Sequence, residues 1–153
     1  MTLYFVDEDH ARYQPWIQEC VLRDISVEPI EDADTAYARL NDAVDIDLVI
    51  LDVMLSAMPT TARYTRERTD AYQQTGLRLA EDLVNLLGPA FPSRLVFLTN
   101  AVGNEVRRAA DEMSQRYLIP MWYKVDIVSS YDFGKRVVKR IDEISGCSRR
   151  GKP

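Results

Sequence analysis

Short apolar segments alternate along this chain with longer segments whose apolar residues recur every three or four positions. The apolar segments have the length of β-strands, at about 2–6, 26–30, 46–52, 94–99 and 119–123. The segments with helical spacing lie at about 10–22, 32–43, 76–87, 103–116 and 131–145. This order predicts an α/β domain over residues 1–146, with a parallel five-stranded sheet and helices on both of its faces.

Two parts of the chain depart from this alternation. Residues 56–75, between the third strand and the third helix, are polar and rich in arginine, whereas such connections usually have about 2–6 residues. We predict a long insertion loop here, which is either solvated and mobile or binds a partner or nucleic acid through its arginines. Those are Arg63, Arg66 and Arg68. Gly146 is expected to end the last helix and to leave 147–153 as a basic flexible tail.

Four of the predicted strands end at polar residues that could act together. These residues are, in chain order, Asp7, Glu8, Asp52, Thr99 and Lys124. Because the carboxyl ends of parallel strands lie along one edge of a sheet, we expect one shared pocket. Three neighbouring carboxylates repel one another, and Mg2+, which prefers oxygen ligands, would relieve that repulsion. Such a set suits formation of an aspartyl phosphate on Asp52.

Composition limits the classes of partner. The net charge of -5 argues against broad nucleic-acid binding. Cys20 and Cys147 are too few for a disulfide framework and are expected to be free thiols in a reducing compartment. No segment reaches the roughly 18 apolar residues of a membrane span, and the first residues do not form a signal peptide. We therefore expect a cytoplasmic protein without a membrane partner.

The strand-end motifs, in their order and spacing, resemble those of the receiver domain of two-component response regulators. The matching segments are Phe5–Asp9, Leu51–Leu55, Leu98–Ala101 and Tyr123–Lys124. The resemblance covers nearly the whole chain. It implies a flavodoxin-like (βα)5 fold, in which a doubly wound parallel sheet carries the long insertion after its third strand.

The resemblance also implies roles for individual residues. Asp52 would be the phosphoacceptor, and Asp7 and Glu8 would be the acidic pair that binds Mg2+. The backbone carbonyl of Met54 would complete the protein ligands of the metal together with Asp52. No other cofactor is implied.

Four further positions are assigned by the same resemblance. Thr99 would be the switch hydroxyl, and Lys124 would pair with the phosphoryl group. Met54 and Ala101 occupy positions that often set the rate of dephosphorylation. Because both side chains are apolar and cannot orient an attacking water, we expect slow hydrolysis of the phosphoryl group.

Several residues differ from the usual receiver pattern. Ser56 replaces a proline after the phosphoacceptor strand, Asn100 is larger than usual, and Val125 replaces a proline after the lysine. Met121 stands where an aromatic switch residue is usual. Trp122 and Tyr123 are expected to point elsewhere in an alternating strand.

Two functions remain open from the sequence. The first is a stand-alone receiver, phosphorylated by a histidine kinase or another phosphodonor, that signals to a protein target in trans and catalyses only its own phosphorylation and dephosphorylation. Homodimerisation is left open. The alternative is a pseudo-receiver, an interaction module that does not cycle through phosphorylation. A haloacid-dehalogenase-type phosphatase is disfavoured because Met54 stands where that class has a second aspartate.

Overall fold

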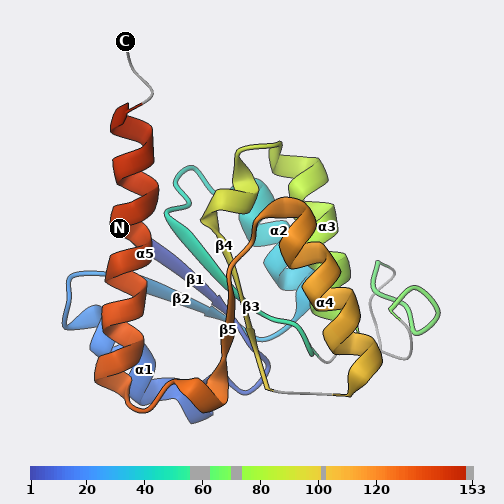
Figure 1. Ribbon diagram of the computed structural model, residues 1–153, viewed down its shortest axis with the longest axis horizontal. Helices are drawn as coiled ribbons and strands as arrows, with labels where there is room; N and C mark the ends of the chain where they lie inside the picture. Colours follow the sequence, from blue (N-terminus) through green and yellow to red (C-terminus); the bar gives the residue numbers. More distant parts are fainter. Residues whose placement is uncertain (56–62, 70–73, 101–102, 151–153) are drawn as a thin grey trace.

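A parallel sheet of five strands forms the centre of the computed structural model, which describes residues 1–55, 63–69, 74–100 and 103–150 (Figure 1). The strands are β1 (Thr2–Val6), β2 (Ser26–Ile30), β3 (Leu48–Asp52), β4 (Leu95–Thr99) and β5 (Met121–Tyr123). Their order across the sheet is β2-β1-β3-β4-β5, and neighbouring strands are parallel. The predicted α/β class, with one parallel five-stranded sheet, is confirmed.

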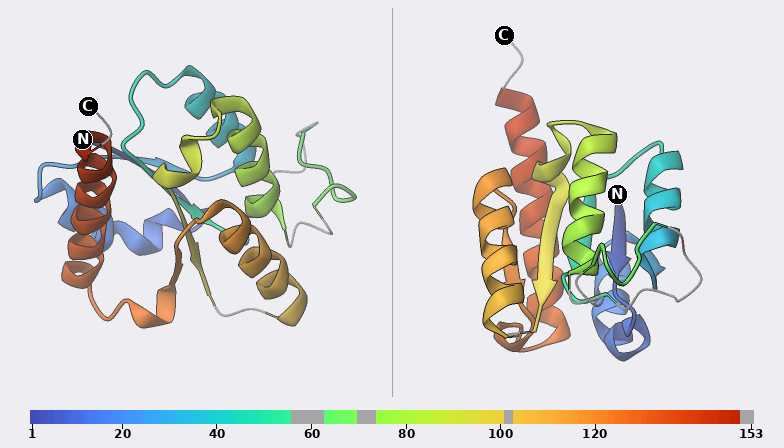
Figure 2. Two further views of the ribbon diagram at one scale, coloured as in Figure 1. Left: turned by 45° about the horizontal axis from the view of Figure 1, so that its top comes forward. Right: turned by 90° about the vertical axis from the view of Figure 1, so that its right-hand side faces the viewer.

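Five α-helices cover the two faces of this sheet. They are α1 (Gln14–Val21), α2 (Ala33–Asp42), α3 (Thr75–Leu87), α4 (Asn104–Tyr117) and α5 (Ser130–Arg150). Helices α1 and α5 lie on one face, and α2, α3 and α4 lie on the other (Figures 1 and 2). Short 3-10 helices lie at His10–Tyr13, Phe91–Arg94 and Lys124–Asp126.

The alternation of side chains along the strands divides the core into two halves. In β1, Leu3 and Phe5 pack on the side of α1 and α5, whereas Tyr4 and Val6 pack on the side of α2 and α3. All five residues of β3 are buried, as expected for a central parallel strand covered on both faces.

Strand register brings the functional residues to one level. Val6 pairs with Leu51, so that Asp7 and Asp52 follow paired residues on adjacent strands. Thr99 pairs with Tyr123, so that Lys124 lies one residue beyond the end of β5. The polar strand ends predicted to share an edge therefore do so.

The helix predicted over 10–22 has a different start. A 3-10 turn (His10–Tyr13) comes first, and α1 then carries Pro15 in its first turn. Proline has no N–H, and its ring clashes with the carbonyl four residues earlier, here Ala11. An α-helix therefore cannot run through residues 11–15.

The prediction that Gly146 ends the last helix is wrong. Helix α5 continues through Gly146 to Arg150 and projects beyond the end of the sheet (Figure 2). A single helical glycine costs only about 1 kcal/mol relative to alanine, so it does not stop a helix whose other residues favour that state. Residues 151–153 of the predicted tail lie outside the described residues. No helix in the described part is long and apolar enough to span a membrane.

Residues 63–69, within the predicted insertion, pack against the domain. Tyr64 is buried, and its hydroxyl donates to Asp82 Oδ2 at 3.0 Å. Arg68 donates to Asp82 Oδ1 at 2.6 Å, and the Arg63 guanidinium lies 3.9 Å from the centre of the Tyr37 ring. All three arginines are exposed, and two of them, Arg63 and Arg68, hold this segment to α2 and α3. Residues 56–62 and 70–73 lie outside the described part.

Candidate functional site

A buried ammonium group joins two carboxylates at the carboxyl edge of the sheet. Lys124 Nζ donates to Asp7 Oδ2 at 2.7 Å and to Asp52 Oδ2 at 2.8 Å. The three residues follow or end β1, β3 and β5, and are separated by up to 117 positions in the chain. The structure therefore brings together three of the predicted site residues.

The second oxygen of each carboxylate is held by the backbone. Asp7 Oδ1 accepts from the N–H of Asp9 at 2.9 Å, and Asp52 Oδ1 accepts from the N–H of Met54 at 2.9 Å. In both cases the carboxylate binds an amide two residues ahead, a local turn that aspartate favours. Both side chains are thereby fixed with one oxygen directed at Lys124.

The charges in this cluster are shielded from solvent and do not balance. The side chains of Asp7, Lys124 and Asp52 are 1%, 7% and 9% exposed. Burial raises the pKa of Asp52 to about 6; attraction to Lys124 opposes this rise, and repulsion from Asp7 adds to it. Asp52 is therefore a carboxylate at pH 7, although its ionisation is costly.

Lys124 stays charged in the same surroundings. Burial alone would lower the pKa of Lys124, but attraction to Asp52 and hydrogen bonds with both acids raise it above its ordinary value. One positive charge thus faces two negative charges. The remaining negative charge favours a further cation at this site.

The donor set suits Mg2+. Two carboxylates that approach one point offer the hard oxygen ligands that Mg2+ prefers, and this ion usually keeps several waters. Glu8, the third predicted ligand, is exposed in the turn after β1. Within the described residues no group of three or more acidic, histidine or cysteine side chains is placed to hold a metal alone. The Met54 carbonyl and waters would have to complete the coordination of an ion held by Asp7 and Asp52.

The start of α3 closes the backbone side of the cluster. The Gly76 N–H donates to the carbonyl of Val53 at 3.1 Å. A Cβ atom on Gly76 would overlap the carbonyl oxygen of Asp52. Only glycine permits this approach, so Gly76 fixes the turn that carries Asp52 and Met54.

Thr99 is buried beside the cluster, but its hydroxyl bonds elsewhere. Its Oγ1 donates to the carbonyl oxygen of Asn100 at 2.8 Å. Thr99 lines a small cavity together with Met121 and Tyr123. The expectation that Tyr123 points away from the Met121 position is wrong, because residues two apart in a strand share a face. Trp122 alone packs on the opposite side, against Phe133.

The structure describes two of the other residues that differ from the receiver pattern. Asn100 and Val125 are both exposed. The described part of the chain has no cis peptide bond. Ala101 and Ser56 lie outside the described residues.

Tyr13 is a neighbour of the site that sequence reasoning missed. Its ring centre lies 4.7 Å from Lys124 Nζ. Tyr13 ends the 3-10 turn that follows β1. The sequence offers no signal for its contact with Lys124, because the two residues are 111 positions apart (124 minus 13).

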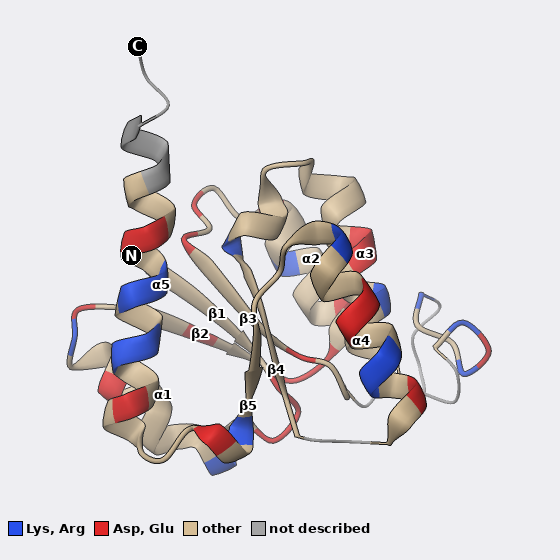
Figure 3. Cartoon of the chain, viewed as in Figure 1, with Lys and Arg blue, Asp and Glu red and all other residues tan. Residues whose placement is uncertain are grey.

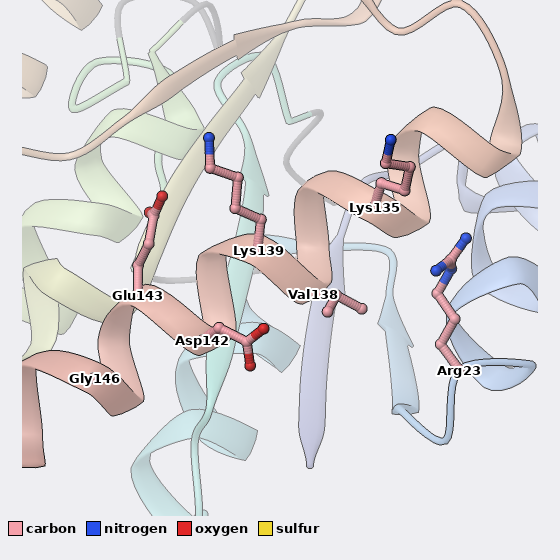
Figure 4. Close-up of a pocket in the computed structure, with 7 residues that line it drawn as sticks. All are labelled: Arg23, Lys135, Val138, Lys139, Asp142, Glu143 and Gly146. Carbon is pink, nitrogen blue, oxygen red and sulfur yellow. The ribbon is translucent and has the colours of Figure 1, made fainter.

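A second hollow, of about 670 Å³, lies between α5 and the chain after α1 (Figure 4). Its lining carries cations from Arg23, Lys135 and Lys139 and acids from Asp142 and Glu143. Charges of both signs also alternate along the outer surface of α4 (Figure 3). Mixed charge in an open hollow provides no defined chemistry, so the buried acid cluster remains the candidate site.

No protein-family model and no curated protein matches the sequence, but solved structures are similar to this one. A CheY-like response regulator receiver domain protein from Methanospirillum hungatei JF-1 has a TM-score of 0.68 and 18% identity, over 95% of this chain and 96% of that one. The chain has the receiver-domain fold. A signal receiver domain of an HD domain-containing protein from Pseudomonas fluorescens Pf-5 gives a TM-score of 0.63 and 14% identity, over 95% and 97% of the two chains.

A third similar structure belongs to a family described as redox sensors in the streptococci, evolved from two-component response regulators. Its TM-score is 0.68 and its identity 14%, over 99% of this chain but only 56% of that one. Since all three identities are low, these similarities establish the fold, and the chemistry must be argued from the site.

Proposed function

We propose that this chain is a response-regulator receiver that accepts a phosphoryl group on Asp52 in a Mg2+-dependent step. A histidine kinase or a small phosphodonor would supply the group. The chain would act in the cytoplasm, alone or as a homodimer, and would signal to a target protein by contact. It would catalyse no reaction beyond its own phosphorylation and dephosphorylation.

The observation that carries this proposal is the position of Lys124 between Asp7 and Asp52. A carboxylate nucleophile needs a cation beside it to bind the oxygens of the incoming phosphoryl group. Lys124 is held within 2.8 Å of Asp52 and is buried there. If Lys124 had only a structural role, one acid would be enough to neutralise its charge, whereas here two acids share this lysine.

In the proposed step, an Asp52 carboxylate oxygen attacks phosphorus. The new O–P bond forms as the bond from phosphorus to the donor's nitrogen or oxygen breaks, and the donor leaves with that electron pair. Lys124 pairs with a phosphoryl oxygen, and Asp7 would hold Mg2+, which supplies charge neutralisation when bound. Thr99 would have to turn from the Asn100 carbonyl to donate to the phosphoryl group.

The lifetime of the phosphoryl group is expected to be long. Met54 lies two residues after Asp52 and is half-buried. Its thioether cannot orient a water for in-line attack. Ala101 is also apolar. Slow hydrolysis would let the chain hold its signal after the donor has gone.

A redox role finds no support at Cys20. This thiol is fully buried, and burial raises its pKa to about 12. A thiol that is not ionised and not accessible reacts slowly with oxidants.

The pseudo-receiver alternative rests on Thr99. Its hydroxyl is engaged by the neighbouring carbonyl, as would be expected if it no longer met a phosphoryl group.

Intact-protein mass after incubation with acetyl phosphate and Mg2+ separates the two functions. We expect one phosphoryl group on the wild type and on Asp45→Asn, an exposed control, and none on Asp52→Asn or with EDTA. A folded wild type that gains no mass would favour the pseudo-receiver.

A further inference from the structure

Lys124 contacts an aromatic ring as well as the two acids. The ring centre of Tyr13 lies 4.7 Å from Lys124 Nζ, within the range of a cation–π interaction. The Lys124 side chain is 7% exposed, so the contact is largely desolvated. The ammonium therefore has three contacts: Asp7, Asp52 and the Tyr13 ring.

Tyr13 is in turn fixed by a cluster of aromatic rings between α1 and α5. Its ring centre is 4.7 Å from that of Trp16, and Trp16 stacks on Phe133 with centres 4.6 Å apart and an angle of 19°. Phe5 meets both Tyr13 and Phe133 edge-on, at 6.2 and 6.0 Å. These stacked and edge-on geometries are the favoured ones for aromatic pairs.

We propose that Tyr13 is a positioning residue for Lys124, and that through Trp16 and Phe133 it links the acid cluster to the α1–α5 face. This inference rests on the proposed function for its effect on phosphorylation. A phosphoryl group on Asp52 would draw Lys124 toward its oxygens and change the Tyr13 contact. The Trp16 ring packs against the Tyr13 ring, so the surroundings of Trp16 would change as well.

The ring, rather than the hydroxyl, is the part that matters. Tyr13→Phe keeps the aromatic face and Tyr13→Leu removes it. Tyr117→Leu, a half-buried tyrosine on α4 at the opposite face of the sheet, is the matched control.

The first measurement does not depend on phosphorylation. The side-chain NMR signals of Lys124, assigned by comparison with Lys124→Arg, should be displaced by the ring of Tyr13. We expect that displacement to remain in Tyr13→Phe and Tyr117→Leu and to be lost in Tyr13→Leu. Lys124 signals that are the same in Tyr13→Leu as in the wild type would overturn the positioning role.

The second measurement is the rate of phosphorylation by acetyl phosphate with Mg2+, read by intact mass. We expect Tyr13→Leu to be slower by about tenfold, the effect of losing one desolvated cation–π contact, and Tyr13→Phe to stay within about twofold of wild type. An active wild type with an equally fast Tyr13→Leu would contradict this inference alone. An inactive wild type would contradict the proposed function, and the Lys124 signals would then decide the positioning role.

The third measurement follows Trp16 fluorescence in a Trp122→Phe background, where Trp16 is the single tryptophan. Mg2+ with beryllofluoride, a phosphoryl mimic, should change the emission, and Tyr13→Leu should abolish the change. A change of equal size in Tyr13→Leu would contradict the link through Tyr13.

Discussion

Two negative charges and one positive charge lie together where solvent hardly reaches them. Asp7, Asp52 and Lys124 are each less than a tenth exposed. Each carboxylate uses one oxygen for Lys124 and the other for a backbone amide. At the scale of single residues, the site is therefore rigid in geometry and short of positive charge. A bound cation, or protonation of Asp52, would relieve that shortage.

The first prediction concerns the ionisation of Asp52. Its pKa is raised in the folded chain to about 6 from an ordinary value of 3.8. Its contribution to stability is therefore present below the unfolded pKa and is lost as the pH rises through about 6. Without metal, Asp52→Asn should gain stability relative to wild type between pH 4 and pH 7, by about 1–3 kcal/mol.

Urea unfolding of the two proteins at both pH values measures this difference. Asp45→Asn, at an exposed position, should show no such change with pH. If the difference between Asp52→Asn and wild type does not change from pH 4 to pH 7, Asp52 does not have the raised pKa described here.

The second prediction concerns Lys124. Lys124→Met leaves two buried carboxylates without their shared cation, and should lower the free energy of unfolding at pH 7 by about 3 kcal/mol. The loss should be smaller at pH 4, because the raised pKa of Asp52 lets this acid take up a proton there. The exposed Lys135→Met is the control and should change stability by less than about 0.5 kcal/mol. Equal effects of the two substitutions would mean that Lys124 is not an integral part of the cluster.

At the scale of elements, helix α3 holds the turn that follows Asp52. It approaches that turn through Gly76, and it holds residues 63–69 through Asp82. One helix thus contacts both the backbone of Asp52 and part of the predicted insertion. We infer that a substitution at either of these two contacts of α3 affects the turn that follows Asp52.

The third prediction tests the close approach at Gly76. Gly76→Ala places a methyl group against the carbonyl oxygen of Asp52. The overpacked backbone should cost about 2–3 kcal/mol or more, because neither chain segment can move aside freely. Gly146→Ala, in the exposed part of α5 with open space around it, should instead stabilise the chain by up to about 1 kcal/mol. Thermal unfolding of both variants gives the comparison, and a harmless Gly76→Ala would contradict the described contact.

The fourth prediction concerns the attachment of residues 63–69. Asp82 accepts from Tyr64 and Arg68, and Tyr64 is buried. Asp82→Ala should therefore cost about 2 kcal/mol, because it leaves a buried hydroxyl without its acceptor.

The same substitution should increase cleavage by trypsin at the arginines of this segment, read by peptide mass. The neighbouring Glu81→Ala removes only a surface ion pair with Arg78 and should change little. Unchanged protection in Asp82→Ala would show that other contacts hold the segment.

At the scale of the whole molecule, the sequence was sufficient for the architecture and for the edge that carries the site. Apolar segments alternating with helical ones specify a parallel sheet, and the polar residues at their ends meet for topological reasons. Asp7, Asp52 and Lys124 were predictable in this way. The length of α5 was not, because the cost of Gly146 had to be weighed against the rest of the helix.

Other features depend on contacts that are distant in the chain. The packing of residues 63–69 requires Asp82 on α3, and the role of Tyr13 requires Lys124 more than a hundred positions later. Neither contact has a local pattern in the sequence. Tyr123 is different, because the two-residue period of a strand by itself places Tyr123 on the same face as Met121.

In the proposed function, Asp52 is the residue that carries the phosphoryl group. The most direct measurement is to treat the chain with acetyl phosphate and Mg2+, reduce the acyl phosphate with borohydride, and map the converted residue by peptide mass. We predict a single converted position, Asp52. Conversion at Asp7 or at any other acid, or no conversion in the folded protein, would rule out Asp52 as the phosphoacceptor.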